Sequence, residues 1–387
     1  MEIPDFYDDR EQTLVKHVVL RTYLERFAHI IGNWCKSITY IDCFSGPWES
    51  RDVALSDTSF GIAIKELTKA RDDLRESPLK KKMRVRCCFV EKDQTAASRL
   101  RSFAESVPDV EIRIVNNTFQ ASIPEILEFV KADPDTFAFY FIDPKGWTGF
   151  DMSTIKPLFA NTRSEVLVNF MSYHINRFIR VPDYADSFIG LYGCHDFLSR
   201  IDEQSSGRDS IEAMVQVYCD NLRKSGAFEF VSSAYVIHRD MDCKHYHLIY
   251  GTRNIRGLEE FRKAERNAME VMEHARNQVR QRRALESGQG ELFGSEEIQE
   301  RWPYYEELRE TQLKATRSAL FAKLKEDKRV SFDEFWKFSL HFPLVWHSDV
   351  SNWIKEWRKS DGLQIVGLAS GERTPKFGKN HSLVLLK

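Results

Sequence analysis

Short apolar runs alternate with amphipathic, charged stretches through the first two thirds of the chain. The apolar runs have the length of strands and are rich in β-branched and aromatic residues, so they predict buried strands. We expect these strands at 38–41, 85–90, 110–115, 136–142 and 165–171. Between them, apolar residues at three- and four-residue spacing predict helices, beginning with one at 12–31. This alternation predicts an α/β fold with a doubly wound, mostly parallel, Rossmann-like sheet.

Two more strands are expected at 228–238 and 246–250, and only a polar turn separates them. They are typical of the antiparallel strands that often close such a sheet. The helical segment at about 175–225 would then be an insertion between strands five and six. A continuous helical pattern at 258–283 completes the first predicted domain, 1–285.

A second domain is expected at 296–387, after a linker at 286–295 that contains the sequence Ser-Gly-Gln-Gly. Helical patterns occupy 298–325, 331–340 and 348–358, and two strand-like runs come after them at 363–368 and 381–386. Helix, helix and a hairpin with a basic, glycine-bearing tip predict a winged-helix-like α+β domain.

The charge balance is nearly neutral, with a formal net charge of −2. A nucleic-acid partner would therefore have to meet a local basic surface. One such surface is the tail 276–283, which carries Arg276, Arg280, Arg282 and Arg283. The other is the hairpin tip, with Arg373, Lys376 and Lys379, whose cations could contact phosphates.

The seven cysteines are odd in number and scattered, and no Cys-x-x-Cys pair occurs. This argues against a metal site and a disulfide framework, and it favours a reducing, cytoplasmic location. The acidic N-terminal segment does not resemble a signal peptide. The sequence has no apolar run of about 18 residues, so no membrane span is expected.

Acidic residues come directly after three of the predicted parallel strands: Asp42, Glu91 and Asp143. The carboxyl ends of parallel strands form the ligand-binding edge of such a sheet. A carboxylate such as Glu91, at the end of strand two, can accept two hydrogen bonds from a ribose diol. Asn117 and Thr118, after strand three, are either adenine contacts or turn residues, with neither favoured.

The turn after Asp42 contains a single glycine, Gly46, rather than the three glycines of a dinucleotide site. A pyrophosphate would therefore be poorly held, which favours S-adenosylmethionine over NAD. No P-loop lysine motif occurs either, which argues against ATP chemistry of that type.

Two segments carry a family resemblance. Asp42-Cys43-Phe44-Ser45-Gly46 resembles the first motif of class I S-adenosylmethionine-dependent methyltransferases, in the form seen in nucleic-acid amino-methylating members. The segment 143–147, Asp-Pro-Lys-Gly-Trp, resembles their fourth motif. Together with Lys16-His17 and the segment 246–257, these motifs look like the three-Cys-motif partner protein family, TcmP, over roughly residues 12–265.

The resemblance implies that the chain binds S-adenosyl-L-methionine. The implied contacts to the methionine end of the cofactor are Asp42, Phe44 and Gly46. Glu91 would contact the ribose, and Asn117 or Thr118 the adenine. Lys16 and Pro47 are two further implied cofactor contacts. The implied catalytic residues comprise Asp143, Pro144, Lys145 and Trp147. Asp143 would orient a target amine, and Trp147 would stack on a flipped base. The chain departs from the common motifs at Trp48, which replaces a glycine, and at Lys145, which replaces a proline.

The predicted function is methyl transfer to a nucleic-acid base, with a three-Cys-motif protein resembling radical S-adenosylmethionine enzymes as a partner. One alternative is a non-catalytic partner subunit that binds nucleic acid or the cofactor. A second is a nuclease with magnesium held by Asp42, Glu91 and Asp143.

Overall fold

The computed structural model describes residues 5–7, 10–46, 50, 55, 57–78, 80–205, 209–286 and 303–386. The chain divides into two compact units, Met1–Glu286 and Ser287–Lys387. Most of the predicted linker, including 287–295, lies outside the described residues.

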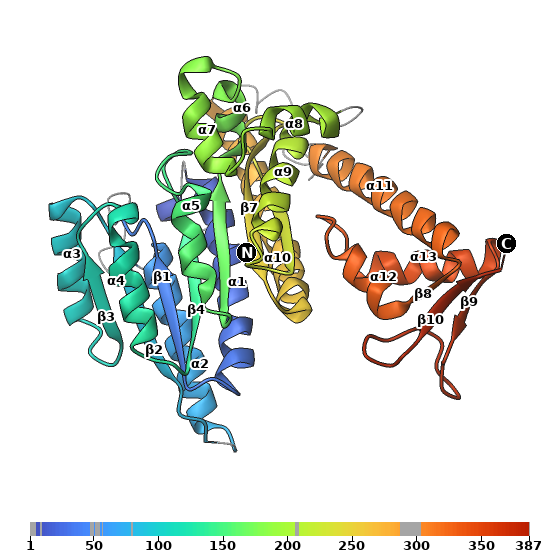
Figure 1. Ribbon diagram of the computed structural model, residues 1–387, viewed down its shortest axis with the longest axis horizontal. Helices are drawn as coiled ribbons and strands as arrows, with labels where there is room; N and C mark the ends of the chain where they lie inside the picture. Colours follow the sequence, from blue (N-terminus) through green and yellow to red (C-terminus); the bar gives the residue numbers. More distant parts are fainter. Residues whose placement is uncertain are drawn as a thin grey trace. The chain divides into compact units, whose positions relative to one another are not determined.

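The first unit is built on a seven-stranded sheet with the order β3-β2-β1-β4-β5-β7-β6 (Figure 1). The first five strands run parallel, and β7 is antiparallel to both of its neighbours. The strands are β1 (Ser37–Asp42), β2 (Arg84–Val90), β3 (Glu111–Val115), β4 (Thr136–Ile142), β5 (Ser164–Phe170), β6 (Phe230–Ile237) and β7 (Lys244–Thr252). This topology confirms the predicted Rossmann-like sheet with antiparallel closing strands.

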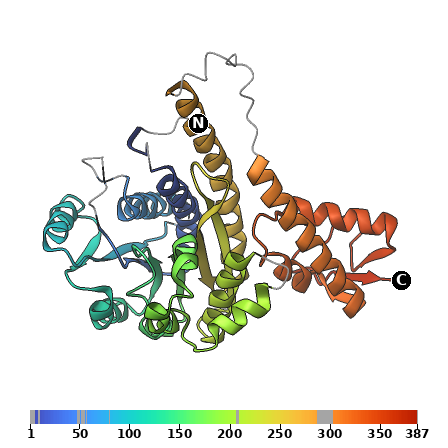
Figure 2. The ribbon, with the colours of Figure 1, turned by 90° about the horizontal axis from the view of Figure 1, so that it is seen from above.

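Helices cover both faces of the sheet (Figures 1 and 2). On one face α1 (Glu11–Gly32) packs against both α2 (Ser59–Glu76) and α10 (Ile255–Glu286). The opposite face carries a continuous apolar core to which the strands and the helices α4 (Phe119–Lys131), α5 (Met152–Ile155), α6 (Ser172–Phe178), α7 (Ala185–Tyr192), α8 (Phe197–Ser205) and α9 (Ser210–Lys224) contribute. The remaining elements are η1 (Asp5–Tyr7), α3 (Gln94–Glu105), η2 (Lys156–Ala160) and η3 (Pro182–Tyr184).

The burial of the strands agrees with their sequence pattern. Every residue of β1, β4 and β5 is buried, whereas the edge strand β3 is mostly half-buried. A near-continuous apolar run is what a parallel strand needs when helices cover both of its faces. The most hydrophobic strand, β4, is central, as its sequence predicts.

Local boundaries differ from the sequence prediction where caps decide them. The helix predicted at 123–130 begins at Phe119, because the Thr118 hydroxyl accepts a hydrogen bond from the Ala121 amide at 3.4 Å. The short helices at 152–160 were not predicted, because that segment carries too few residues for a periodic pattern. The predicted insertion contains α6, η3 and α7, with breaks around Pro182, and then α8 and α9.

The strand order creates a switch point between β1 and β4. From β1 the chain moves outward to β2 and β3, and it then returns to place β4 on the other side of β1. Connections that leave two adjacent parallel strands in opposite directions open a crevice at their carboxyl ends, where ligands bind in this class of fold. Asp42 ends β1, and Asp143 comes directly after β4.

The second unit comprises three helices and a small antiparallel sheet in its described part. The helices are α11 (Pro303–Asp327), α12 (Phe332–Ser339) and α13 (His347–Ser360), and the strands are β8 (Arg329–Ser331), β9 (Leu363–Val366) and β10 (Ser382–Leu385). Strand β10 pairs with β8 and β9. Ser331 caps α12 by accepting from the Glu334 amide at 3.1 Å. The hairpin is present and β8 was not predicted; the winged-helix assignment stays a prediction.

Within the described residues, no helix combines the length and the apolar character needed to cross a membrane.

Candidate functional site

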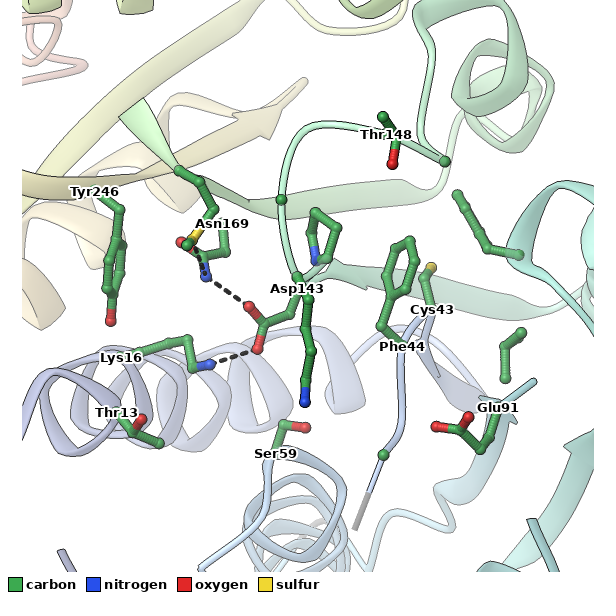
Figure 3. Close-up of a pocket in the computed structure, with 18 of the residues that line it drawn as sticks. Thr13, Lys16, Cys43, Phe44, Ser59, Glu91, Asp143, Thr148, Asn169 and Tyr246 are labelled. Carbon is green, nitrogen blue, oxygen red and sulfur yellow. Dashed lines mark hydrogen bonds and ion pairs between the residues drawn. The ribbon is translucent and has the colours of Figure 1, made fainter. Parts of the chain in front are cut away.

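The crevice at the carboxyl ends of the strands contains a cavity of about 990 Å³ (Figure 3). Its walls come from α1, the turn after β1, the start of α2, the ends of β2 to β5, the start of α4, α6 and the start of β7. The volume is at the upper end of the range usual for small-molecule sites, so the cavity has room for a nucleoside-sized ligand together with part of a second molecule.

Most of the predicted site residues line this cavity. They are Lys16, Phe44, Gly46, Glu91, Asn117, Thr118, Asp143, Pro144 and Lys145. Pro47 and Trp48 lie outside the described residues. Asp42 and Trp147 are not among the residues of the cavity wall.

Asp143 is held by side chains from two other elements. Lys16 of α1 donates from Nζ to Asp143 Oδ2, and Asn169 of β5 donates from Nδ2 to Asp143 Oδ1 at 2.6 Å (Figure 3). Two donors fix the direction of the carboxylate, and the ammonium compensates its charge. Asn169 was not predicted as a site residue, although a polar residue after the apolar run Val-Leu-Val, near the end of the strand, was a visible signal.

Asp42 lies beneath the cavity wall and has no solvent exposure. Its carboxylate accepts from the Phe44 amide at 3.2 Å, from the Ser59 hydroxyl at 2.5 Å and from the Tyr40 hydroxyl at 3.3 Å. Burial raises the pKa of Asp42 to about 6; the Ser59 hydrogen bond opposes this shift, and the nearby charge of Asp143 adds to it. In this structure Asp42 shapes the turn that carries Phe44 and Gly46 rather than facing the cavity.

Glu91 comes directly after β2 and lines the cavity, with 3% of the residue exposed. The Asp93 amide donates to Glu91 Oε1 at 2.7 Å, which orients the carboxylate. Burial raises the pKa of Glu91, and the hydrogen bond from Asp93 opposes the shift. Beside it, the rings of Phe44 and Phe119 are 5.3 Å apart and give this half of the cavity an apolar surface.

The alternatives for Asn117 and Thr118 both fit the structure. Asn117 Oδ1 accepts from the Thr118 amide at 2.8 Å, and Thr118 caps α4. Both residues also line the cavity, next to Phe119 and Gln120. They therefore form the turn at the start of α4 and remain in contact with the space that a ligand would occupy.

The other half of the cavity, beyond Asp143, has a different lining. Its walls are aromatic, imidazole and guanidinium side chains from α6 and β7: Tyr173, His174, Arg177, His245 and Tyr246. Tyr246 Oη donates to the Gln12 carbonyl at 2.6 Å, and burial, with the charge of Asp143, raises the Tyr246 pKa well above its ordinary value. Burial lowers the pKa of His245 to about 4, so this ring is neutral at pH 7. None of these five residues was predicted as a site residue.

Trp147 packs into an aromatic cluster instead of the cavity wall. Its ring is stacked on Phe188 with the centroids 5.2 Å apart, and its Nε1 donates to Ser187 Oγ at 3.0 Å. His174, Phe178 and Tyr184 complete the cluster. In this arrangement Trp147 fixes α6 and α7 over the loop after β4, and stacking of Trp147 on a base would require a rearrangement.

The arrangement gives no support to the magnesium alternative. Among the described residues no group of three or more His, Cys, Asp or Glu side chains could hold a metal ion. Of the three acids proposed, Asp42 is buried and hydrogen-bonded to protein donors, and Asp143 is paired with Lys16. Their oxygens do not converge on a common point that a divalent cation requires.

The basic tail of α10 is largely engaged in protein contacts. Arg276 is 1% exposed and donates to the Met241 carbonyl at 3.0 Å. Arg280 pairs with Asp242 and Arg282 with Glu11, each at 3.0 Å, and the side chain of Arg283 lies outside the described residues. The tail therefore connects the end of α10 to the β6–β7 turn and to α1 within the first unit. The other predicted basic group, Arg373, Lys376 and Lys379, lies exposed in the loop between β9 and β10.

No family model matches the sequence, and no curated protein does. Solved structures do give matches. The O-methyltransferase from Bacillus cereus in complex with SAH is 15% identical with a TM-score of 0.29, over 60% of this chain and 80% of that chain. A Klebsiella pneumoniae protein assigned as an O-methyltransferase is 12% identical with a TM-score of 0.31, over 66% and 92%. At these TM-scores neither likeness adds to what the strand order and the cavity establish.

Proposed function

We propose that the first unit binds S-adenosyl-L-methionine and transfers its methyl group to an amino group of a nucleic-acid base. The observation that carries this proposal is the position of Glu91. Its carboxylate comes directly after β2 and lines the cavity on the β1–β2–β3 side of the switch point, where a ribose diol is bound in this class of fold. Phe44 and Phe119 lie beside it as apolar contacts for the rest of the nucleoside.

The methionine end of the ligand fits the space between the turn after β1 and the start of α2. Thr58 and Ser59, at the N-terminus of α2, line the cavity there. A helix N-terminus favours an anionic group, such as the carboxylate of the methionine part. When bound, S-adenosylmethionine supplies a methyl group that its sulfonium already activates, so the protein mainly has to position the two reactants.

The acceptor belongs on the other side of Asp143. A carboxylate held by Lys16 and Asn169 can accept a hydrogen bond from an amino group and direct its lone pair toward the methyl group. Around this point Tyr173, His174 and Arg177 offer aromatic surface and a positive charge. Such a lining suits a planar base with an attached phosphate better than it suits an acidic or aliphatic acceptor.

Calorimetric titration with S-adenosylmethionine tests the cofactor site. We expect the wild type to bind, and Glu91→Gln to weaken binding about 10-fold or more, because a hydrogen bond to a charged group contributes about 1.5–3 kcal/mol. Glu105→Gln, which neutralises an exposed acid on α3, is the matched control and should bind as the wild type does. Absence of binding by the wild type would refute the proposal.

Methyl transfer itself is tested with tritiated S-adenosylmethionine and total DNA and RNA as acceptors. The alternative of a non-catalytic subunit, working with a three-Cys-motif protein, predicts cofactor or nucleic-acid binding without label transfer. Label in the nucleic-acid fraction supports the enzyme, and binding without transfer, even with the partner added, supports the subunit.

A further inference from the structure

Helix α13 of the second unit presents two opposite faces. One face is buried and apolar: Val350, Trp353, Ile354 and Trp357. The opposite face is an exposed stripe at four- and three-residue spacing: Ser348, Asn352, Lys355 and Lys359. Because a helix turns once every 3.6 residues, these four side chains form a single row along the helix. We call this row the α13 stripe.

The stripe carries positive charge and no acid. In the part of the chain that the structure describes, Lys355 and Lys359 have no ion-pair partner. The nearest acid on the helix is Glu356. It is paired with Arg317 of α11 at 2.9 Å, and this cation compensates the negative charge of Glu356 beside the stripe. Both lysines therefore extend into solvent with their charge uncompensated.

The loop between β9 and β10 adds cations next to the end of the stripe. Arg358, in the last turns of α13, donates from Nη1 to the Arg373 carbonyl at 3.1 Å and connects the helix to this loop. The side chains of Arg373 and Lys379 are exposed, and the one acid in the loop, Glu372, is paired with Lys376 at 2.9 Å.

We propose that the α13 stripe and this loop form a docking surface for duplex DNA. The major groove of B-form DNA admits one α-helix, and the polar side chains of the stripe are of the kind that contact base edges there, Asn352 above all. The lysines at the C-terminal end of the stripe, with Arg373 and Lys379, then neutralise phosphates. The deep, narrow major groove of A-form RNA does not admit a helix, which is why the surface fits DNA rather than duplex RNA.

The docking surface belongs to the second unit alone, and it stands whether or not the cavity of the first unit binds S-adenosylmethionine. In this proposal the apolar face of α13 packs inside the second unit, and its opposite face contacts DNA. The proposed DNA contact uses no residue of the α10 tail, whose arginines bind protein groups instead.

Fluorescence anisotropy of the full-length chain tests the surface, with a labelled random duplex of about 30 base pairs at about 50 to 200 mM KCl. For the double variant Lys355→Gln/Lys359→Gln we expect weaker binding and a slope of log K against log[KCl] that is smaller by about 2, because each phosphate contact contributes about 0.9 to the slope. The control Lys314→Gln/Lys325→Gln removes the same charge from exposed lysines on α11 and should bind as the wild type does. Circular dichroism verifies that both variants fold.

Three results would overturn the proposal: no DNA binding by the wild type, an unchanged salt slope in the α13 variant, or an equal loss in the α11 control. Tighter binding to duplex RNA of the same length would overturn the assignment to DNA. Titration of S-adenosylmethionine against the same α13 variant separates the two proposals, because its affinity should equal that of the wild type.

Discussion

Asp42 and Asp143 occupy equivalent positions in the sequence pattern, but their surroundings in the folded protein differ. Each lies at the carboxyl end of an apolar strand, and the two strands, β1 and β4, are neighbours in the sheet. Asp143 lines the cavity and contacts Lys16 and Asn169. Asp42 is fully buried and accepts hydrogen bonds from the Phe44 amide and the Ser59 hydroxyl.

The difference arises from the residues that come after each carboxylate in the chain. After Asp42 the backbone turns back at once, and α2 places Ser59 against the carboxylate. After Asp143 come Pro144, whose backbone cannot donate, and Gly146, which adopts φ +144, and this loop forms part of the cavity wall. The same sequence pattern therefore gives one carboxylate that supports the turn and one that lines the cavity.

Replacing Asp143 should have the largest effect on activity. Asp143→Ala removes the acceptor that orients the amino group, so we expect methyl transfer to fall on the order of 10²–10³-fold. Cofactor affinity should stay within about threefold, because the proposed cofactor contacts lie on the other side of the switch point. Label transfer and calorimetry measure the two quantities, and an unchanged rate would remove Asp143 from the mechanism.

Replacing Asp42 should have the larger effect on stability. At about pH 5, where Asp42 is mostly protonated, Asp42→Ala leaves the Phe44 amide and the Ser59 hydroxyl without their buried acceptor, which should lower the free energy of unfolding by about 3 kcal/mol. Asp143→Ala should cost less, on the order of 1–2 kcal/mol, because the Asp143 side chain is 18% exposed and water can replace it at Lys16 and Asn169. Urea unfolding of both variants tests this; equal losses would mean that the two carboxylates do not differ as described.

The pH dependence of stability sharpens the comparison further. The pKa of Asp42 is about 6 in the folded state and near 3.8 when unfolded, so the folded state holds its proton more tightly. Its contribution to stability is therefore complete below about pH 4 and is lost as the pH rises through about 6. From about pH 4 to pH 7 the unfolding free energy of the wild type should fall relative to Asp42→Asn, by on the order of 2–3 kcal/mol. A constant difference across this range would contradict the assigned pKa.

The sequence predicted the first unit well, because its signals are local. The apolar runs became the buried strands β1, β2, β4 and β5, and the acids at the ends of β1, β2 and β4 mark the carboxyl edge. Prediction was weaker where a cap or a partner decides the outcome. Thr118 starts α4 four residues before the predicted beginning, and the cluster around Trp147 includes Phe188, which lies 41 positions away along the chain.

The sequence singled out lining residues in one half of the cavity and none in the other half. Phe44, Glu91 and Asp143 could be picked out as candidates because they come after strands in a pattern visible within each segment. Asn169 reaches the cavity because β5 pairs with β4, and His245, which comes after the insertion, reaches it because the antiparallel β7 pairs with β5. No spacing in the chain connects residues that a long insertion separates.

By itself, the sequence determined the alternation of strands and helices, because strands that helices cover on both faces require apolar runs. It also determined the type of residue at each strand end, because the chain has to turn at the carboxyl edge of the sheet. Only the tertiary structure decided the environment of each charge. It buried Asp42 and Arg276, paired Asp143 with Lys16, and left Lys355 and Lys359 in water. The physical reason is that the effect of a charge depends on its solvation and on its nearest opposite charge, and both are set by elements far apart in the chain.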